Sequence, residues 1–411
     1  MHPIRRRAGV APVVVVGIGA DGWDGLSPAS SAQIRRAEVL VGSARQLALV
    51  PVSMAAERVP WPSPMSEALP ELFEQYEGRT VVVLASGDPM LSGIGTTLTR
   101  LLGRDRVHVL PAPSSVSLAC ARLGLAVEET QVVSLVGRPL ELLTPHVLPG
   151  RRLVVLGSDG RTPAAIAALL SEHGYGASRV TALARLGGSD ERTFSGTAAA
   201  WPHPDTGPLV LTAVEVVADG GTRPLPTVPG LPDDAFDDDG QLTKREVRAV
   251  TLSRLGPLPG QLLWDVGAGA GSIGIEWMRT HPSCRAVAVE ARPDRAERIG
   301  ANASRLGVPG LQVVEGRAPE ALGGLSAPDA VFVGGGATAP GLVDTCWAAL
   351  PPGGRLVINA VTLESEAVLA GWFGRVGGDL VRIGVQRAEP VGTFTGWKPA
   401  MPVTTWSVLK P

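Results

Sequence analysis

The stretch Trp264–Gly274, WDVGAGAGSIG, joins a short apolar run to a dense set of glycines. The apolar run at 262–266 predicts a buried strand, and the residues from Ser272 onward predict a helix. Glycines at such a junction let the backbone turn tightly and approach a ligand, and the start of the helix offers unpaired N–H groups. The stretch therefore predicts an α/β domain with a ligand-binding loop after its first strand.

The glycine spacing leaves the ligand of this loop open. Gly269–Gly274 contains G-x-G-x-x-G, and Glu290, at the end of the next predicted strand, can hold a ribose hydroxyl in a NAD enzyme or in a methyltransferase. Asp265 completes a D-V-G-x-G-x-G pattern that resembles motif I of Rossmann-like methyltransferases, and the segment 350–357 resembles the turn into their fifth strand. Both features favour S-adenosylmethionine over a nicotinamide cofactor. The remaining alternative is that the glycines only pack a helix against a sheet.

The same alternation of strands and helices continues in both directions. Short β-branched runs predict strands at 13–16, 81–84, 107–110, 132–136, 153–156 and 209–214, then at 262–266, 286–290, 312–315, 330–333 and 355–359. The segment 244–255 predicts an amphipathic helix. Strands alternating with helices indicate an α/β layer fold. In the second half, the βαβ spacing implies parallel pairing with right-handed crossovers.

The chain length and a change in composition predict two domains. The chain has 411 residues, and a domain usually takes roughly 100–200. Residues 218–240 are rich in Gly, Pro and Asp, which is typical of a boundary. We expect one domain at 1–220, a linker at 221–240 without a core of its own, and a second domain at 241–411. The glycine motifs of the halves differ, so we infer no duplication.

The composition excludes several classes of protein. A hydrophobic fraction of 45%, a charged fraction of 18% and a formal net charge of −2 are typical of a globular protein without a general attraction to nucleic acid or anionic lipid. No apolar run approaches the ~18 residues that a membrane span needs. Cys120, Cys284 and Cys346 are far apart, which predicts neither disulfides nor a metal site and fits a cytoplasmic protein.

Further segments of the second half extend the resemblance. Gly240–Arg248, Asp265–Gly271, Asn302-Ala303, Gly334–Gly336 and Asn359–Glu364 together resemble the C15-methylating, decarboxylating domain of the cobalamin pathway, which has a Rossmann-like class I methyltransferase fold. The segment 316–319 falls where this class binds the adenine. The resemblance implies S-adenosylmethionine contacts at Thr243, Asp265, Gly267, Ala268, Gly269, Ala270, Gly271, Glu290, Gly316 and Ala318.

The first half resembles a different methyltransferase family. Val13–Gly19 followed by Gly25-Leu26, Val81–Leu84 followed by Ala85–Pro89, and Pro113–Val116 resemble the tetrapyrrole methylases, whose members hold the cofactor in a cleft between two α/β subdomains. The resemblance implies cofactor contacts at Gly17, Gly19, Ser86, Gly87, Asp88, Pro89, Ser115 and Val116. An ordinary turn is the alternative for the Gly-Asp-Pro sequence. A phosphate-binding P-loop is disfavoured because no glycine cluster ends in Gly-Lys-Ser/Thr.

Together the resemblances imply a bifunctional enzyme of corrin biosynthesis with one S-adenosylmethionine site per domain. The first domain would methylate C5 of precorrin-6B (precorrin-6Y). The second would methylate C15 and release carbon dioxide from the ring C acetate, giving precorrin-8X. The family also implies self-association through the C-terminal domain. The alternatives are a single catalytic domain beside a cofactor-binding or assembly module, a cobalt-containing substrate, and an NAD-dependent oxidoreductase.

Basic residues are expected to orient the polycarboxylate substrate, because arginine and lysine bind carboxylates. The candidates are Lys244, Arg245, Arg248, Arg387 and Lys398. We expect the glycines 334–336 to form a flat platform for the macrocycle, with a tight turn as the alternative. The spacing of Arg292, Arg295 and Arg298 is typical of a solvated helix face and predicts no role. Methyl transfer is an in-line displacement that needs alignment rather than a protein nucleophile, so no catalytic residue is assigned.

Overall fold

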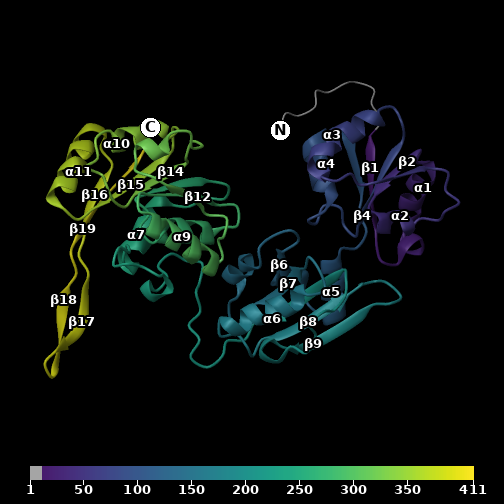
Figure 1. The fold of residues 1–411 in the computed structure, drawn as a ribbon, viewed down its shortest axis with the longest axis horizontal. Coiled ribbons are helices and arrows are strands. Elements are labelled where there is room, and N and C mark those ends of the chain that lie inside the picture. Colours follow the sequence, from purple (N-terminus) through teal and green to yellow (C-terminus); the bar gives the residue numbers. More distant parts are fainter. Residues whose placement is uncertain (1–11) are drawn as a thin grey trace. The chain divides into compact units, whose positions relative to one another are not determined.

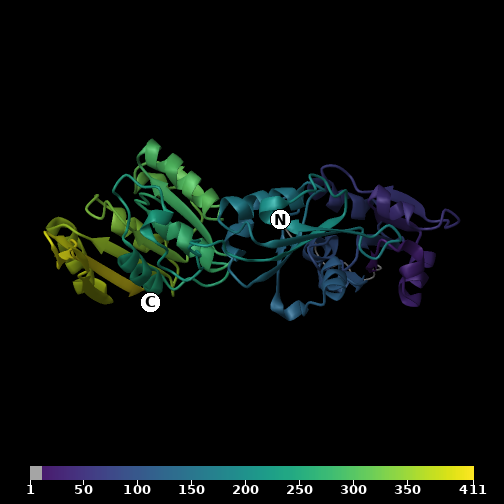
Figure 2. The same cartoon turned by 90° about the horizontal axis from the view of Figure 1, so that it is seen from below.

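The structure is a computed structural model that describes residues 12–411. Its internal contacts divide the chain into two compact units. The N-terminal unit comprises the described residues up to Arg138 together with Pro149–Thr222, and the C-terminal unit comprises Pro139–Leu148 and Arg223–Pro411. Each unit is built of sheets covered by helices (Figure 1, Figure 2), which confirms the predicted α/β class.

The first sheet of the N-terminal unit is parallel throughout, with strand order β3-β2-β4-β1-β5. Its strands are β1 (Val13–Ile18), β2 (Val39–Gly42), β3 (Glu57–Pro60), β4 (Val81–Ser86) and β5 (Val107–Leu110). Helices cover both faces: α1 (Pro28–Arg36) and α2 (Ala44–Ala48) lie on one, and α3 (Met65–Gln75) and α4 (Ile94–Leu102) on the other. Because both faces are buried, the central strands are unbroken apolar runs.

The second sheet of this unit is mixed, with strand order β6-β7-β10-β8-β9. Only β6 and β7 are parallel neighbours. Its strands are β6 (Thr130–Ser134), β7 (Arg152–Leu156), β8 (Arg179–Ala184), β9 (Arg192–Thr197) and β10 (Val210–Glu215), and α5 (Ser115–Leu123) and α6 (Thr162–Glu172) pack on it. The N-terminal unit therefore has the two α/β subdomains expected from the resemblance.

The C-terminal unit contains a seven-stranded sheet of order β13-β12-β11-β14-β15-β19-β16. The strands β11 (Leu262–Val266), β12 (Arg285–Glu290), β13 (Gln312–Glu315), β14 (Ala330–Val333) and β15 (Arg355–Ala360) are parallel, and β16 (Asp379–Ile383) and β19 (Val403–Leu409) continue the sheet in antiparallel fashion. One face carries α7 (Arg245–Leu255), α8 (Ser272–Thr280) and α9 (Pro293–Arg305), and the other carries α10 (Leu342–Ala349) and α11 (Leu363–Val376). The parallel strands place their carboxyl ends at one edge.

A two-stranded arm leaves this sheet between β16 and β19. It consists of β17 (Gln386–Val391) and β18 (Phe394–Pro399), which pair only with each other among the described strands. Figure 1 shows it extending away from the body of the C-terminal unit. The arm was not predicted, since its strands are exposed and carry a proline, Pro390.

The short 3-10 helices are connecting segments. They are η1 (Gly22–Gly25), η2 (Arg104–Arg106), η3 (Val127–Glu129), η4 (Leu140–His146), η5 (Ala198–Ala200), η6 (Asp233–Ala235) and η7 (Glu320–Leu322). No helix within residues 12–411 combines the length and apolarity needed to cross a membrane.

The structure corrects the expected linker at 221–240. The residues from Arg223 onward belong to the C-terminal unit, and Leu231, Ala235 and Phe236 are buried in its core. The segment from Arg223 is therefore part of the C-terminal unit. Its apolar residues pack with α7 and α8, and Asp233, Asp237 and Asp239 pair with arginines of α7 and α9.

Candidate cofactor and substrate sites

The glycine loop of the C-terminal unit, Gly267–Gly271, connects β11 to α8 at the carboxyl edge of the sheet. Gly267, Gly269 and Gly271 all have positive φ, which L side chains rarely adopt. A Cβ on Gly267 would lie 3.0 Å from the backbone of Gly335, and one on Gly269 would lie 2.8 Å from the carbonyl oxygen of Gln241. Backbone from separate segments thus crowds the loop, which explains its composition.

Asp265, in the strand that precedes the loop, binds the backbone of the helix that follows it. The side chain is fully buried, and its Oδ2 accepts a hydrogen bond from the N–H of Gly274 in α8 at 2.8 Å. The other oxygen has no hydrogen-bond partner within the described part of the chain. Burial, aided by the nearby carboxylate of Glu290, raises the pKa of Asp265 to about 7. Its position fixes the start of α8 beneath the predicted cofactor site.

Glu290 joins the glycine loop to the neighbouring strand β12. It is buried at the end of β12, where its carboxylate accepts hydrogen bonds from the N–H of Gly269 at 2.9 Å and from that of Arg292 at 3.0 Å. Gly316, another predicted contact, donates its N–H to the carbonyl of Glu290 at 2.9 Å. Ala318 follows in the same connection and is partly buried. The predicted residues after β11, β12 and β13 therefore lie next to one another.

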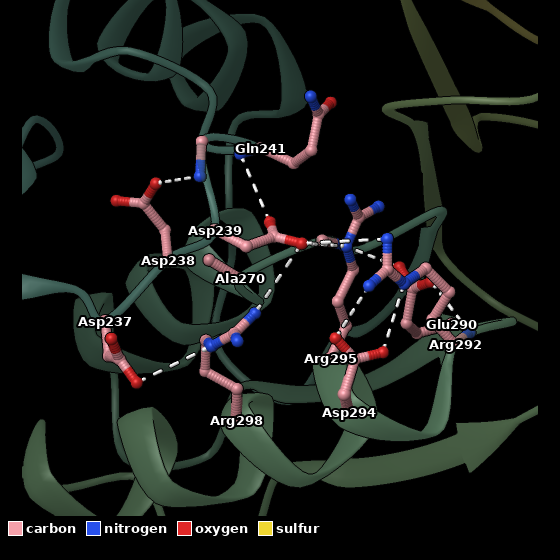
Figure 3. A network of polar contacts seen from close by, with 12 residues as sticks. Asp237, Asp238, Asp239, Gln241, Ala270, Glu290, Arg292, Asp294, Arg295 and Arg298 are labelled. Carbon is pink, nitrogen blue, oxygen red and sulfur yellow. Dashed lines mark hydrogen bonds and ion pairs between the residues drawn. The ribbon is translucent and has the colours of Figure 1, made fainter.

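An acidic segment, which we call the strap (residues 237–241), lies against the glycine loop (Figure 3). Asp239 accepts a hydrogen bond from Arg295 of α9 at 2.9 Å, which lowers the pKa of Asp239. Asp237 pairs with Arg298 at 3.5 Å. The buried Asn302 donates both to the carbonyl of Asp237 and to that of Ala270 in the glycine loop. Helix α9 thus fastens the strap to the loop.

These contacts correct the expectation for the arginines of α9. Their spacing predicts a solvated face without a role, yet the side chains of Arg295 and Arg298 are only 19% and 20% exposed and face the strap. Arg292 is more exposed and pairs mainly with Asp294. The partners of Arg295 and Arg298 lie far away in sequence, which local spacing cannot reveal.

Arg248 is not available to orient a substrate, which corrects a prediction. Its side chain is completely buried, and its guanidinium donates to Glu276 at 2.6 Å and also contacts Asp233 and the carbonyls of Leu231 and Thr243. Protein groups therefore occupy its donors. The arginine binds α7 to α8 and holds Thr243, a predicted cofactor contact, at the entrance to α7.

The other basic candidates are accessible. Lys244 and Arg245 are exposed where α7 begins. On the arm, Arg387 pairs with Glu246 of α7 at 2.5 Å and Lys398 pairs with Glu389 at 2.9 Å. Arg387 and Lys398 are also register partners across the arm. The exposed glycines 334–336 follow β14 beside the glycine loop, so the expected platform lies at the same edge of the sheet.

The predicted site of the N-terminal unit also lies at the carboxyl edge of a parallel sheet. A Cβ on Gly17 would lie 2.0 Å from the carbonyl oxygen of Gly87 and 2.6 Å from the N–H nitrogen of Ala112. The N–H of Gly87 donates to Ile18, and that of Ala112 donates to Gly87. The loops after β1, β4 and β5 therefore touch through their backbones, and glycine is required where they meet.

The remaining predicted residues of this site have different surroundings. Asp88 accepts a hydrogen bond from the N–H of Met90, as in an ordinary turn, and Pro89 is buried beside it. Gly19 packs against Asp21. Ser115 is the first residue of α5, which Ser114 caps, and Val116 is buried in the core.

Sequence reasoning missed Arg45 and Gln46 at this edge. Both donate hydrogen bonds to Ser86 Oγ, at 2.7 Å and 3.0 Å. The sequence analysis did not predict β2, the strand that places these two residues at the edge of the sheet. Within residues 12–411, no group of His, Cys, Asp and Glu side chains could hold a metal ion.

Two family models match the chain and define its class. The model of the tetrapyrrole (corrin/porphyrin) methylases matches residues 12–201, and the model of the precorrin methyltransferase domain matches residues 234–410. The protein thus combines a tetrapyrrole methylase with a Rossmann-like precorrin methyltransferase.

Relatives share this arrangement over nearly the whole length. A protein of Sinorhizobium sp. named precorrin-6Y C(5,15)-methyltransferase (decarboxylating) is 50% identical over 398 residues, which cover 97% of this chain and 96% of the relative. A Mycobacterium tuberculosis protein of the same name is 49% identical, covering 97% of this chain and 100% of the relative. A Salmonella typhimurium cobalt-precorrin-6B C(15)-methyltransferase (decarboxylating) is 33% identical over 39% of this chain and 85% of the relative. The chain belongs to the precorrin-6Y C5,15-methyltransferase (decarboxylating) family.

Proposed function

We propose that the chain binds one S-adenosylmethionine in each unit and methylates precorrin-6B (precorrin-6Y) twice in cobalamin biosynthesis. The N-terminal unit methylates C5, and the C-terminal unit methylates C15 and releases carbon dioxide from the ring C acetate, giving precorrin-8X. The observation that carries this proposal is that each unit has its own crowded glycine site at the carboxyl edge of a parallel sheet, where α/β proteins bind ligands. The relatives named for both methylations support it.

The residues of the C-terminal site fit the parts of S-adenosylmethionine. Glu290 uses one lone pair on each oxygen for backbone N–H groups, which leaves further lone pairs for ribose hydroxyls. The glycine loop lets the amino-acid end approach the backbone, with Thr243 close by. The connection at 316–318 would hold the adenine. In the N-terminal unit, the loops around Gly17, Gly87 and Ser115 would bind S-adenosylmethionine.

The chemistry requires alignment more than reactive side chains. S-adenosylmethionine supplies a methyl group on a sulfonium, and its transfer to carbon is an in-line displacement whose barrier depends on orientation and exclusion of water. In the decarboxylation, the bond from the acetate carbon to its carboxylate breaks, and the electron pair passes into the conjugated macrocycle. The protein therefore holds the macrocycle and the cofactor in line.

The exposed basic residues at the start of α7 are the best candidates to orient the substrate in the C-terminal unit. Lys244 and Arg245 are exposed, and no ion pair involving them is formed within the described chain. Arg387 and Lys398 already pair with glutamates, so they would have to exchange these partners for a substrate carboxylate. The glycines 334–336 would let the flat macrocycle approach the backbone.

We also propose a metal-free substrate and a cytoplasmic location. The relatives that match nearly the full length are named for precorrin-6Y, whereas the relative named for cobalt-precorrin matches 39% of this chain. Cys120, Cys284 and Cys346 are all buried as free thiols, which fits a reducing compartment.

The product mass tests the proposal directly. The full chain is incubated with S-adenosylmethionine and precorrin-6B, and the product is analysed by mass spectrometry. We expect a gain of two methyl groups and the loss of one carbon dioxide. A product with a single methyl gain and carbon dioxide loss would remove C5 methylation from the proposal, and inhibition by NADH in competition with S-adenosylmethionine would favour an oxidoreductase.

The strap should contribute to cofactor binding in the C-terminal unit. We expect Asp239→Asn to raise the KM for S-adenosylmethionine in C15 methylation by no more than about fivefold, because an exposed ion pair contributes little and Asp239 helps to hold the strap against Gly269. The KM of the wild type should rise with salt, and that of the variant should rise less. The control is Asp344→Asn, which removes an ion pair between α10 and α11 that includes no strap residue. Equal effects of both substitutions would contradict this role.

The arm is the proposed surface for self-association. Val391, Phe394 and Trp397 are 62%, 80% and 73% exposed on it. An isolated two-stranded hairpin is at best marginally stable in water, and both outer edges of this one lack a neighbouring strand among the described residues. A second copy of the chain can cover the same apolar side chains with its own arm, since a two-fold interface brings identical patches together.

Substitution of the arm's aromatic residues should therefore change the molecular mass in solution. We expect the Phe394→Ser, Trp397→Ser double variant to sediment as a smaller species than the wild type. The control is Leu363→Ser, which removes an equally exposed apolar residue at α11. If the arm variant keeps the sedimentation coefficient of the wild type, self-association does not use the arm.

A further inference from the structure

An arginine and a serine meet at the carboxyl edge of the parallel sheet in the N-terminal unit. Arg45 lies in the first turn of α2, directly after β2, and Ser86 ends β4. Because β2 and β4 are parallel neighbours, their carboxyl ends share one edge. Arg45 Nη2 donates a hydrogen bond to Ser86 Oγ at 2.7 Å. The pair thus borders the loop 86–89, which the proposed cofactor site of this unit uses.

The surroundings hold both residues in place. Ser43 and Gln46 form a reciprocal capping box at the start of α2, in which each side chain binds the backbone N–H of the other. Gln46 is buried, and its Nε2 donates to Ser86 Oγ at 3.0 Å. Ser86 Oγ therefore accepts two hydrogen bonds, and its own proton is left to donate elsewhere. The first turn of α2 and the hydroxyl form a fixed arrangement.

The charge of Arg45 has no counter-ion among the residues that the structure describes. Within residues 12–411 no carboxylate pairs with it, and residues 1–11 contain no Asp or Glu. Its side chain is half-buried, and burial lowers its pKa. Two other arginines of the unit do have carboxylate partners, since Arg79 pairs with Glu57 and Arg122 with Glu191. A partly desolvated cation without a partner is a receptor for an anion, and most of its donors are unused.

We propose that Arg45, together with the hydroxyl of Ser86, binds a carboxylate of a ligand of the N-terminal unit. The planar guanidinium matches a carboxylate through parallel hydrogen bonds, which a lysine cannot reproduce. This inference rests on the proposed function, under which the carboxylate belongs either to a side chain of the macrocycle or to the amino-acid end of S-adenosylmethionine. Both ligands would offer a carboxylate. If the macrocycle supplies it, Arg45 contributes to the affinity for precorrin-6B, and if the cofactor supplies it, Arg45 contributes to the affinity for S-adenosylmethionine.

The test compares Arg45→Gln with the wild type in the full chain. Hydrogen bonds to charged groups contribute about 1.5–3 kcal/mol, so we expect a roughly 10–100-fold rise in one KM of C5 methylation. If the macrocycle supplies the carboxylate, the KM for precorrin-6B rises and that for S-adenosylmethionine does not. If the cofactor supplies it, the reverse holds. Arg45→Lys should recover part of the loss, and C15 methylation in the same reaction should be unchanged.

Two further variants, Arg36→Gln and Ser86→Ala, serve as comparisons for Arg45→Gln. Arg36→Gln removes an exposed arginine of α1 in the same unit and should behave as the wild type. Ser86→Ala should raise the same KM as Arg45→Gln, by less. The carboxylate site is overturned if Arg45→Gln folds and leaves both KM values within twofold of the wild type. If the wild type shows no C5 methylation, the proposed function fails instead, and the site is judged from binding of S-adenosylhomocysteine and precorrin-6B, where unchanged affinities in Arg45→Gln overturn it.

Discussion

Replacing Arg248 with methionine is expected to destabilise the C-terminal unit by about 3–5 kcal/mol, because removing one member of a buried ion pair leaves the other charge unpaired in the core. Glu276 is 2% exposed and would retain only the N–H groups of Gly230 and Leu231. The carbonyls of Leu231 and Thr243 would also lose their donor.

Hydrogen exchange followed by mass spectrometry can measure this loss locally. Peptides from α8 and β11 should exchange faster in Arg248→Met, whereas peptides from β4 should keep the wild-type rate and serve as an internal reference. The matched control is Arg285→Met, since Arg285 is exposed at the start of β12. Normal protection together with a loss of C15 methylation would contradict the structural role and restore Arg248 as a substrate contact.

Replacing Gly17 with alanine is expected to lower the rate of C5 methylation by about 100-fold, the loss that a displacement of roughly 1 Å in a catalytic site can cause. The added Cβ would lie 2.0 Å from the carbonyl oxygen of Gly87 and 2.6 Å from the nitrogen of Ala112. These are backbone atoms, so the loops after β1, β4 and β5 must separate to admit the methyl group. The C-terminal unit has its own glycine loop and should be unaffected.

The product mass again provides the measurement. The Gly17→Ala variant should accumulate a product that has gained one methyl group and lost carbon dioxide. Gly220→Ala is the control in the same unit, because its Cβ would have no neighbouring atom within 4 Å. Full C5 methylation by Gly17→Ala would show that these loops do not form the C5 site.

The sequence predicts many strands of the larger sheets, including the edge strands β5, β6 and β13, but it misses the interior strands β2 and β8 as well as β9 and the arm. β1, β4 and β11 are buried on both faces along most of their length, so they are apolar runs whose cause is local, apart from Asp265 in β11 and Ser86 at the end of β4. β9 is an exposed edge strand of polar residues, and the arm strands are also exposed. Their conformation depends on pairing with distant segments, which leaves little trace in local composition.

The candidate sites divide in the same way. The contact between Glu290 and the glycine loop follows from motif spacing, because neighbouring parallel strands end at one edge. The pairing of Asp239 with Arg295 crosses 56 residues and needs the folded chain. Arg248 was predicted to contact the substrate, because its position in the helix sequence does not distinguish a buried arginine from an exposed one. The folded structure shows that it is buried and paired with Glu276.

The fixed carboxylate of Glu290 affects the entropy cost of ligand binding at the C-terminal site and its selectivity among nucleotides. Two backbone N–H groups hold the side chain in one rotamer before a ligand arrives, so little rotational entropy remains to be lost on binding. Under the proposed function, a ribose with two free hydroxyls can dock without rearranging this residue. A nucleotide with a phosphate on the same ribose would bring negative charge against a buried carboxylate, so the site discriminates against NADP-like ligands by repulsion.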